Sequence, residues 1–243
     1  MRIVAVEIAL VFAAVIVALL VLSPKTVHKY RVPIYVVTAL VAAYFTFSHV
    51  LGYDISWINR YVRQVFTLGA LSNVMFAFVA YTGVLPKRWE LTKRLRSVRA
   101  EMSVMACILA LGHNMLYMNY FVEFFTDPLG MRGYYMYACT ASLILIALMI
   151  PLFITSFYFV RKQMKARTWK SLQRLSYIFY FALWVHVVGL YLSAALAGTK
   201  MGDIYSLVIY TIIWVPYFVS RLAKYLRERG SGGDDDTMEV EPQ

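Results

Sequence analysis

The sequence has little charge and few cysteines, and each shortage excludes a class of protein. Only 15% of its 243 residues are charged, whereas 61% are hydrophobic. A soluble domain of this length could not hide so much apolar surface, so the composition indicates an integral membrane protein. The two cysteines, Cys107 and Cys139, both fall within long apolar stretches. They do not support a disulfide framework or a metal-binding knuckle.

Dinucleotide-binding signals are also missing. The chain has no glycine-rich fingerprint following a strand, and it is too short to add a flavin and nicotinamide module to its apolar stretches. We therefore expect no internal FAD or NAD site.

Long apolar stretches are present instead, and seven of them could cross about 30 Å of hydrocarbon. They cover residues 3–22, 33–51, 64–85, 102–122, 137–160, 175–197 and 204–220. Backbone groups in lipid must be satisfied within their own segment, which favours helices. The predicted fold is an all-α, polytopic membrane helix bundle. The first stretch lacks a clear small-residue cleavage site, so we expect a retained helix rather than a signal peptide.

Basic residues gather in four segments between or after these stretches. The segments 23–32, 86–100, 161–174 and 221–229 hold nineteen of the 24 Lys and Arg residues. The positive-inside rule then predicts an extracytoplasmic N-terminus and a cytoplasmic C-terminus. The net charge of +11 needs no nucleic-acid partner, because topology and attraction to anionic membrane lipids account for it. The acidic, glycine-rich tail at 230–243 has the composition of a disordered segment.

Histidines within predicted spans are the strongest functional signal, since titratable residues in hydrocarbon are costly and often functional. His113 and His186 each lie about 12 residues from the inner end of their helices, which corresponds to roughly 18 Å at 1.5 Å per residue. Equal depth is what a ligand shared by two helices requires, and a porphyrin can accept one imidazole on each face. The alternative is two unrelated histidines, each hydrogen-bonded across helices. Zinc is less favoured, since no carboxylate or thiol pair lies at a useful spacing.

Three stretches resemble a known family. They are RSVRAEMSVMACILALGHNMLY (96–117), LFITSFYFVRKQMKARTWKSLQRLSYIFYFALWVHVVGLY (152–191) and, more weakly, AYTGVLP (80–86). Together they resemble the ferric-reductase-like transmembrane domain. That family includes the membrane haem subunit of the periplasmic methionine sulfoxide reductase system and the membrane halves of ferric reductases and NADPH oxidases.

The resemblance implies a domain organisation. A haem-binding core, six-helix-like in the family, would cover residues 64–197. Two helices at 1–63 would precede it, and a helix with a basic end at 198–229 would follow it, before the tail at 230–243.

The resemblance also implies ligand positions. Family members hold two stacked b haems with two histidine pairs, whose members lie 13 or 14 residues apart on a helix. His113 and His186 match the two outer ligands, whereas Arg99 and Gln173 stand at the inner positions. This predicts one b haem near the outer leaflet. Arg99 and Gln173 would then contact a haem propionate, a quinone head group or a lipid phosphate.

Other side chains have more than one interpretation. His49 could gate an outer substrate site, ligate a second haem or simply hydrogen-bond at the interface. Several aromatic residues either line a haem pocket or face lipid: Tyr117, Tyr120, Phe121, Tyr180 and Trp184.

The expected function is a membrane b-type cytochrome that passes single electrons, which the resemblance implies is an oxidoreductase electron-transfer subunit. A separate cytoplasmic flavoprotein or quinol would donate the electrons. An extracytoplasmic ferric ion, redox protein or quinone would accept them. The alternative is a haem-free membrane sensor, transporter or structural subunit that retains the fold, because two family histidines are absent.

Overall fold

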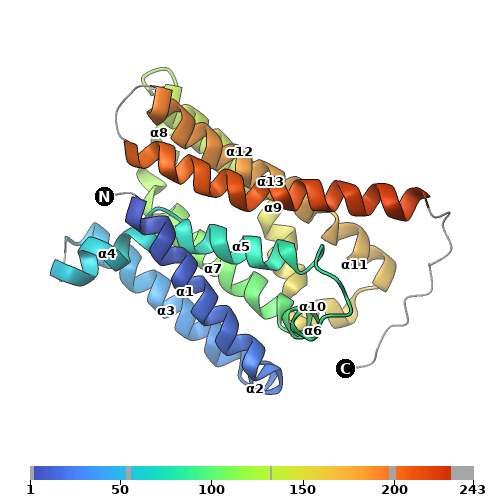
Figure 1. Ribbon diagram of the computed structural model, residues 1–243. Helices are drawn as coiled ribbons and strands as arrows, with labels where there is room; N and C mark the ends of the chain where they lie inside the picture. The colour runs from blue at the N-terminus through green and yellow to red at the C-terminus, as the bar shows by residue number, and fades with distance from the viewer. Residues whose placement is uncertain (1–2, 53–55, 132, 197–200, 231–243) are drawn as a thin grey trace.

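The computed structural model describes residues 3–52, 56–131, 133–196 and 201–230, and the regular secondary structure in these ranges is helical (Figure 1). In chain order the helices are α1 (Ile3–Leu22), α2 (Pro24–Lys29), α3 (Arg31–Val50), α4 (Ser56–Thr67), α5 (Ala70–Tyr81), α6 (Glu90–Ser97), α7 (Arg99–Leu116), α8 (Met118–Thr126), α9 (Gly133–Ser156), α10 (Tyr158–Gln163), α11 (Ala166–Gln173), α12 (Leu175–Leu196) and α13 (Met201–Gly230). The predicted all-α bundle is confirmed.

Five helical segments among the described residues are long and apolar enough to cross a membrane. They cover Ala5–Leu22, Arg31–Ser48, Gly133–Ser156, Ala166–Leu192 and Ile204–Arg227. The chain is therefore a multi-pass membrane protein. The predicted number of seven spans is not confirmed, because the stretches at 64–85 and 102–122 do not form single long apolar helices.

Both of those stretches are divided by a turn. Gly69 has a φ of +67°, in the left-handed region, and separates α4 from α5. This conformation is readily adopted by glycine, which has no Cβ to clash with the backbone. Tyr117 lies at the second turn, between α7 and α8. Hydrophobicity alone predicts one continuous span in each case, because Gly69 and Tyr117 are both compatible with an apolar stretch.

Helix α7 lies within the bundle and packs against α3, α5 and α9, while α12 packs against α9 and α13. Helix α1 packs against α5 and presents small side chains that are almost fully buried, including Ala5, Ala9 and Ala13. Small residues let helix backbones approach closely in a membrane. The central position of α7 places its histidine between several helices rather than at a lipid-facing surface.

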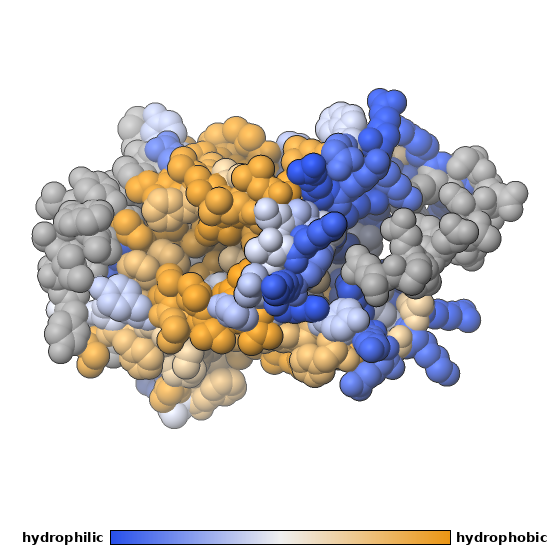
Figure 2. All heavy atoms as spheres, turned by 90° about the horizontal axis from the view of Figure 1, so that it is seen from below, coloured by the Kyte–Doolittle hydropathy of each residue, from blue (hydrophilic) through white to orange (hydrophobic). Residues whose placement is uncertain are grey.

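Polarity divides the molecule along its length. Figure 2 shows hydrophobic residues over the middle and hydrophilic residues gathered at one end. Helices α6 and α11 and the C-terminal end of α13 lie toward that end (Figure 1). The basic segments predicted to share one membrane side are therefore compatible with the observed arrangement.

Candidate functional site

A cavity of about 350 Å³ lies among α5, α7, α8, α9, α12 and α13. Both His113 and His186 line it, together with the polar side chains of Asn73 and Asn114. Much of the remaining wall is aromatic and includes Tyr117, Tyr120, Phe121, Tyr135, Phe179, Tyr191 and Tyr210. The volume lies within the range of about 300–1,000 Å³ that is typical of ligand sites in proteins.

His113 is oriented by a backbone carbonyl. Its Nδ1 lies 2.7 Å from the carbonyl oxygen of Thr67, the last residue of α4. A carbonyl only accepts hydrogen bonds, so Nδ1 carries the proton and donates it. The neutral ring then keeps a lone pair on Nε2, which is the nitrogen left for a metal. Metal-ligating histidines commonly have their second nitrogen held in this way.

Gly69 lies against the ring of His113. A Cβ built on Gly69 would come within 3.1 Å of the ring atoms Cδ2 and Cγ and 3.2 Å of Nε2. Gly112, the residue before His113 on α7, lets α3 pack close, because a Cβ there would lie 3.1 Å from the Cβ of Ala42. Gly69 therefore leaves room for the His113 ring, and Gly112 leaves room for α3.

His186 is buried, with an exposed fraction of 8%, and lies on α12. Its Nδ1 has no hydrogen-bond partner among the described residues. Asn73 lies on the same cavity, and its Nδ2 is likewise buried without a described partner. Buried polar atoms are normally satisfied, so these two point to an unfilled interaction at the site.

These residues fit a b haem. Two imidazoles reach one cavity from different helices, one of them in a tautomer suited to ligation, and aromatic walls suit a planar apolar ring. Tyr117, Tyr120 and Phe121 line the cavity as one of the sequence interpretations expected, but Tyr180 and Trp184 are not among its lining residues.

The two inner positions lie away from this cavity. Gln173 donates from Nε2 to Thr155 Oγ1 at 3.4 Å, and Trp169 Nε1 donates to the Thr155 carbonyl at 3.3 Å. These contacts join α11 to the end of α9. The Arg99 guanidinium instead interacts electrostatically with the hydroxyls of Tyr180 and Tyr217. Neither residue is among those that line the histidine cavity.

His49 belongs to α3, but its side chain lies outside the described residues. Its assignment to the site therefore stays a prediction.

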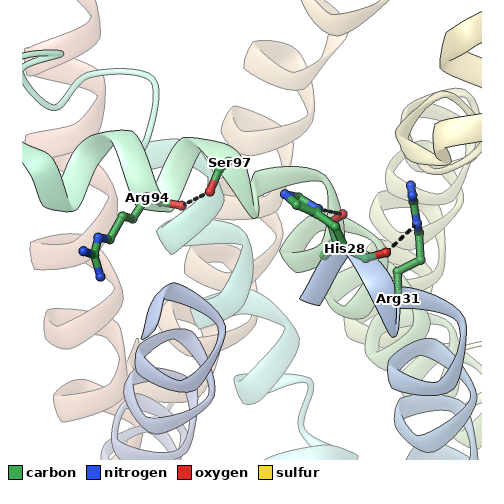
Figure 3. Close-up of polar contacts among 5 residues, drawn as sticks. His28, Arg31, Arg94 and Ser97 are labelled. Carbon is green, nitrogen blue, oxygen red and sulfur yellow. Dashed lines mark hydrogen bonds and ion pairs between the residues drawn. The ribbon is translucent and has the colours of Figure 1, made fainter. Parts of the chain in front are cut away.

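One polar pair was missed by the sequence analysis. His28, from the basic segment 23–32, lies in α2 with its Nδ1 2.9 Å from Oε1 of Glu101. Glu101 is buried, with an exposed fraction of 4%. Figure 3 shows His28 beside Arg31, whose Nε donates to the His28 carbonyl oxygen at 3.1 Å. The pair is separated by 73 residues in the chain, so no local pattern could reveal it.

The fold and this cavity define a class of protein, a multi-pass helical membrane protein with a histidine-lined interior site. Comparison with known proteins adds the family. Residues 66–184 match the family described as ferric reductase like transmembrane component. This match confirms the predicted resemblance of that region to the ferric-reductase-like transmembrane family.

A relative that aligns with most of the chain was also found. An uncharacterized protein from Treponema pallidum (strain Nichols) is 36% identical over 171 residues, which cover 70% of this chain and 47% of that protein. The chain thus matches about half the length of this relative. No solved structure matches the chain significantly.

Proposed function

We propose that this protein is a membrane b-type cytochrome that passes single electrons through one haem, with His113 and His186 as the two axial ligands. The observation that carries the proposal is that both histidines line the same cavity. His113 and His186 would hold the haem iron, and the group so held would supply electron transfer rather than oxygen binding.

The protein's own contribution would be orientation and burial. The Thr67 carbonyl would hold the His113 ring and favour Nε2 as the ligand. The buried environment of His186 and the aromatic wall would keep water from the iron ligands. Asn73 Nδ2 would offer a hydrogen bond to a polar substituent of the bound group.

A single haem is supported by the packing around Arg99. Tyr180, Trp214 and Tyr217 are buried and in mutual ring contact, with centroids 5.6 to 5.9 Å apart. The hydroxyls of Tyr180 and Tyr217 interact electrostatically with the Arg99 side chain. Arg99 stands at an inner ligand position of the family. Side chains thus occupy the surroundings of that position, and neither Arg99 nor Gln173 supplies a typical haem-iron ligand.

Electrons would enter from a separate cytoplasmic flavoprotein or from quinol, since the sequence has no dinucleotide fingerprint. They would leave to an extracytoplasmic acceptor. The basic segments would attract an acidic donor protein through long-range electrostatics. A bound quinone would be the cofactor in the second case, and its reduced form, quinol, would be the donor.

The experiment is expression with haem supplied, purification in detergent, and oxidised and dithionite-reduced spectra with a haem-to-protein ratio. We expect a low-spin b-type spectrum near one haem per chain in the parent protein. His113→Ala and His186→Ala should each lose the low-spin spectrum. His28→Ala serves as the matched control, because His28 contacts Glu101 and is not part of the cavity.

Each other outcome has a definite meaning. Retention of the parent spectrum in both ligand variants would refute the assignment of His113 and His186. Two haems per chain would refute the single site. Absence of haem from the folded parent protein would favour the haem-free alternative.

A further inference from the structure

A second concave site lies where α12 begins and α13 approaches its end. This groove has a volume of about 680 Å³. Its lining includes Arg174, Tyr177, Tyr217, Arg221, Leu222 and Tyr225. The proposed electron-transfer function uses none of these side chains as a ligand.

The groove carries positive charge without a neutralising carboxylate. Among the described residues, neither Arg174 nor Arg221 forms an ion pair with an acidic side chain. None of the residues that line the groove is acidic. Its lining therefore carries the two positive charges of Arg174 and Arg221, which favours an anionic ligand.

Arg221 is also held in place. Its guanidinium carbon lies 4.3 Å from the centroid of the Tyr177 ring, so the aromatic face supports the planar group. A guanidinium fixed in this way keeps its N–H donors for bidentate contact with phosphate oxygens. Arg174, which lies between α11 and α12, supplies a second guanidinium to the groove.

The position of the groove corresponds to a membrane surface. The apolar stretch 204–220 of α13 ends directly before Arg221. At 1.5 Å per residue, the 30 residues of α13 extend about 45 Å, which exceeds the hydrocarbon thickness. Figure 1 shows the C-terminal end of α13 extending past its neighbours. Arginine and tyrosine at such a boundary reach the level of the lipid head groups.

Apolar surface continues beside the charges. Leu222 is 58% exposed and Tyr225 is 50% exposed, and both line the groove. A free phosphate would leave this surface uncovered, whereas the glycerol and upper acyl region of a lipid would cover it. We propose that the groove binds an anionic phospholipid, with the phosphate between Arg174 and Arg221 and the first part of an acyl chain along Leu222. Basic pockets between transmembrane helices are known sites for anionic lipid head groups.

The test uses the full chain, stripped of lipid in a neutral detergent. Thermal unfolding and native mass spectrometry would be followed while phosphatidylglycerol, phosphatidylcholine or inorganic phosphate is added. We expect phosphatidylglycerol to stabilise the protein and to remain bound, with little effect from the other two. Arg221→Gln and Arg174→Gln should each weaken phosphatidylglycerol binding by roughly fivefold.

Two further variants keep the result interpretable. Arg167→Gln removes an exposed charge from α11 that is not in the groove, so it should bind the lipid like the parent protein. Arg221→Lys keeps the charge but not the planar fork, and should weaken binding less than Arg221→Gln. If Arg221→Gln does not fold, Arg221→Lys and Arg174→Gln still decide the question.

Equal binding of phosphatidylglycerol and phosphatidylcholine would overturn the proposal. So would unchanged lipid affinity in the folded groove variants. If inorganic phosphate stabilises the protein as much as phosphatidylglycerol does, the proposal is wrong and the groove is a simple anion site. The haem spectrum should stay the same in all these variants, so failure here is distinguishable from failure of the electron-transfer proposal.

Discussion

At the scale of single residues, the site depends on how closely backbone approaches His113. The Thr67 carbonyl fixes the ring through Nδ1, and Gly69 lies within a few ångströms of the ring atoms. Gly69 also turns the chain with a positive φ. Gly69 therefore both ends α4 and leaves space for the His113 ring.

Gly69→Ala should destabilise the protein and disturb the His113 ring. A left-handed backbone costs an alanine about 1–2 kcal/mol, and contact with the ring adds to that cost. Gly52→Ala is the matched control, because Gly52 has nearly the same φ, +69°, but no atom within 4 Å of an added Cβ. Thermal unfolding in detergent and the haem spectrum provide the measurement. Equal effects of the two substitutions on both readouts would refute the role of the ring contact.

Trp214→Phe should cost about 1–3 kcal/mol, since it removes a buried hydrogen bond and leaves its acceptor unpaired. The Nε1–H of Trp214 donates to Asn73 Oδ1 at 3.0 Å, and the side chain is fully buried. Trp184→Phe is the control, because Trp184 Nε1 has no described partner. Denaturant unfolding of both variants would measure the difference. The prediction fails if Trp184→Phe is as costly as Trp214→Phe.

At the scale of elements, cationic side chains stabilise the C-terminal end of α5. Arg96 of α6 donates from Nε to the Thr82 carbonyl at 3.1 Å, and Lys224 of α13 donates to the Gly83 carbonyl at 2.9 Å. Unsatisfied carbonyls carry partial negative charge at a helix C-terminus, so cations are favoured there. Burial lowers the pKa of Arg96, and Arg99 acts in the same direction. The guanidinium nevertheless stays charged in proteins.

Arg96→Ala should therefore loosen the segment after α5 and cost about 1 kcal/mol. Hydrogen exchange of the amides at 82–85 should become faster. Arg94→Ala provides the comparison on the same helix, because its pair with Glu90 is exposed and spans 3.4 Å. Such surface pairs contribute less than about 1 kcal/mol. Unchanged exchange at 82–85 in Arg96→Ala would show that this end does not depend on the cation.

Element boundaries were only partly predictable. The apolar stretches at 3–22 and 175–197 correspond closely to α1 and α12, because hydrophobic length is a local property. The stretch at 64–85 instead contains the end of α4, a left-handed glycine and α5. Its break depends on packing against His113, which lies more than 40 positions further along the chain.

At the scale of the whole molecule, the basic segments predict which end faces the cytoplasm. Helices α6 and α8 lie toward opposite ends of the molecule (Figure 1). Lys93→Cys would place a thiol on α6, and Leu129→Cys would place one in the segment between α8 and α9. Both positions are exposed, whereas the native Cys107 and Cys139 are buried. A membrane-impermeant maleimide should label Leu129→Cys in intact cells and Lys93→Cys only after permeabilisation. The reverse pattern would invert the predicted topology.

The sequence by itself determined the membrane class, most of the long apolar helices and the two histidines as the strongest site candidates. These depend on hydrophobic length and on spacing within single helices, both of which are local. Only the tertiary structure decided that His113 and His186 line one cavity, that Thr67 holds the His113 ring, and that His28 meets Glu101. Thr67 and His113 lie 46 positions apart in the chain, and His28 and Glu101 lie 73 positions apart. Their formation depends on how the helices pack together, which no single stretch of sequence encodes.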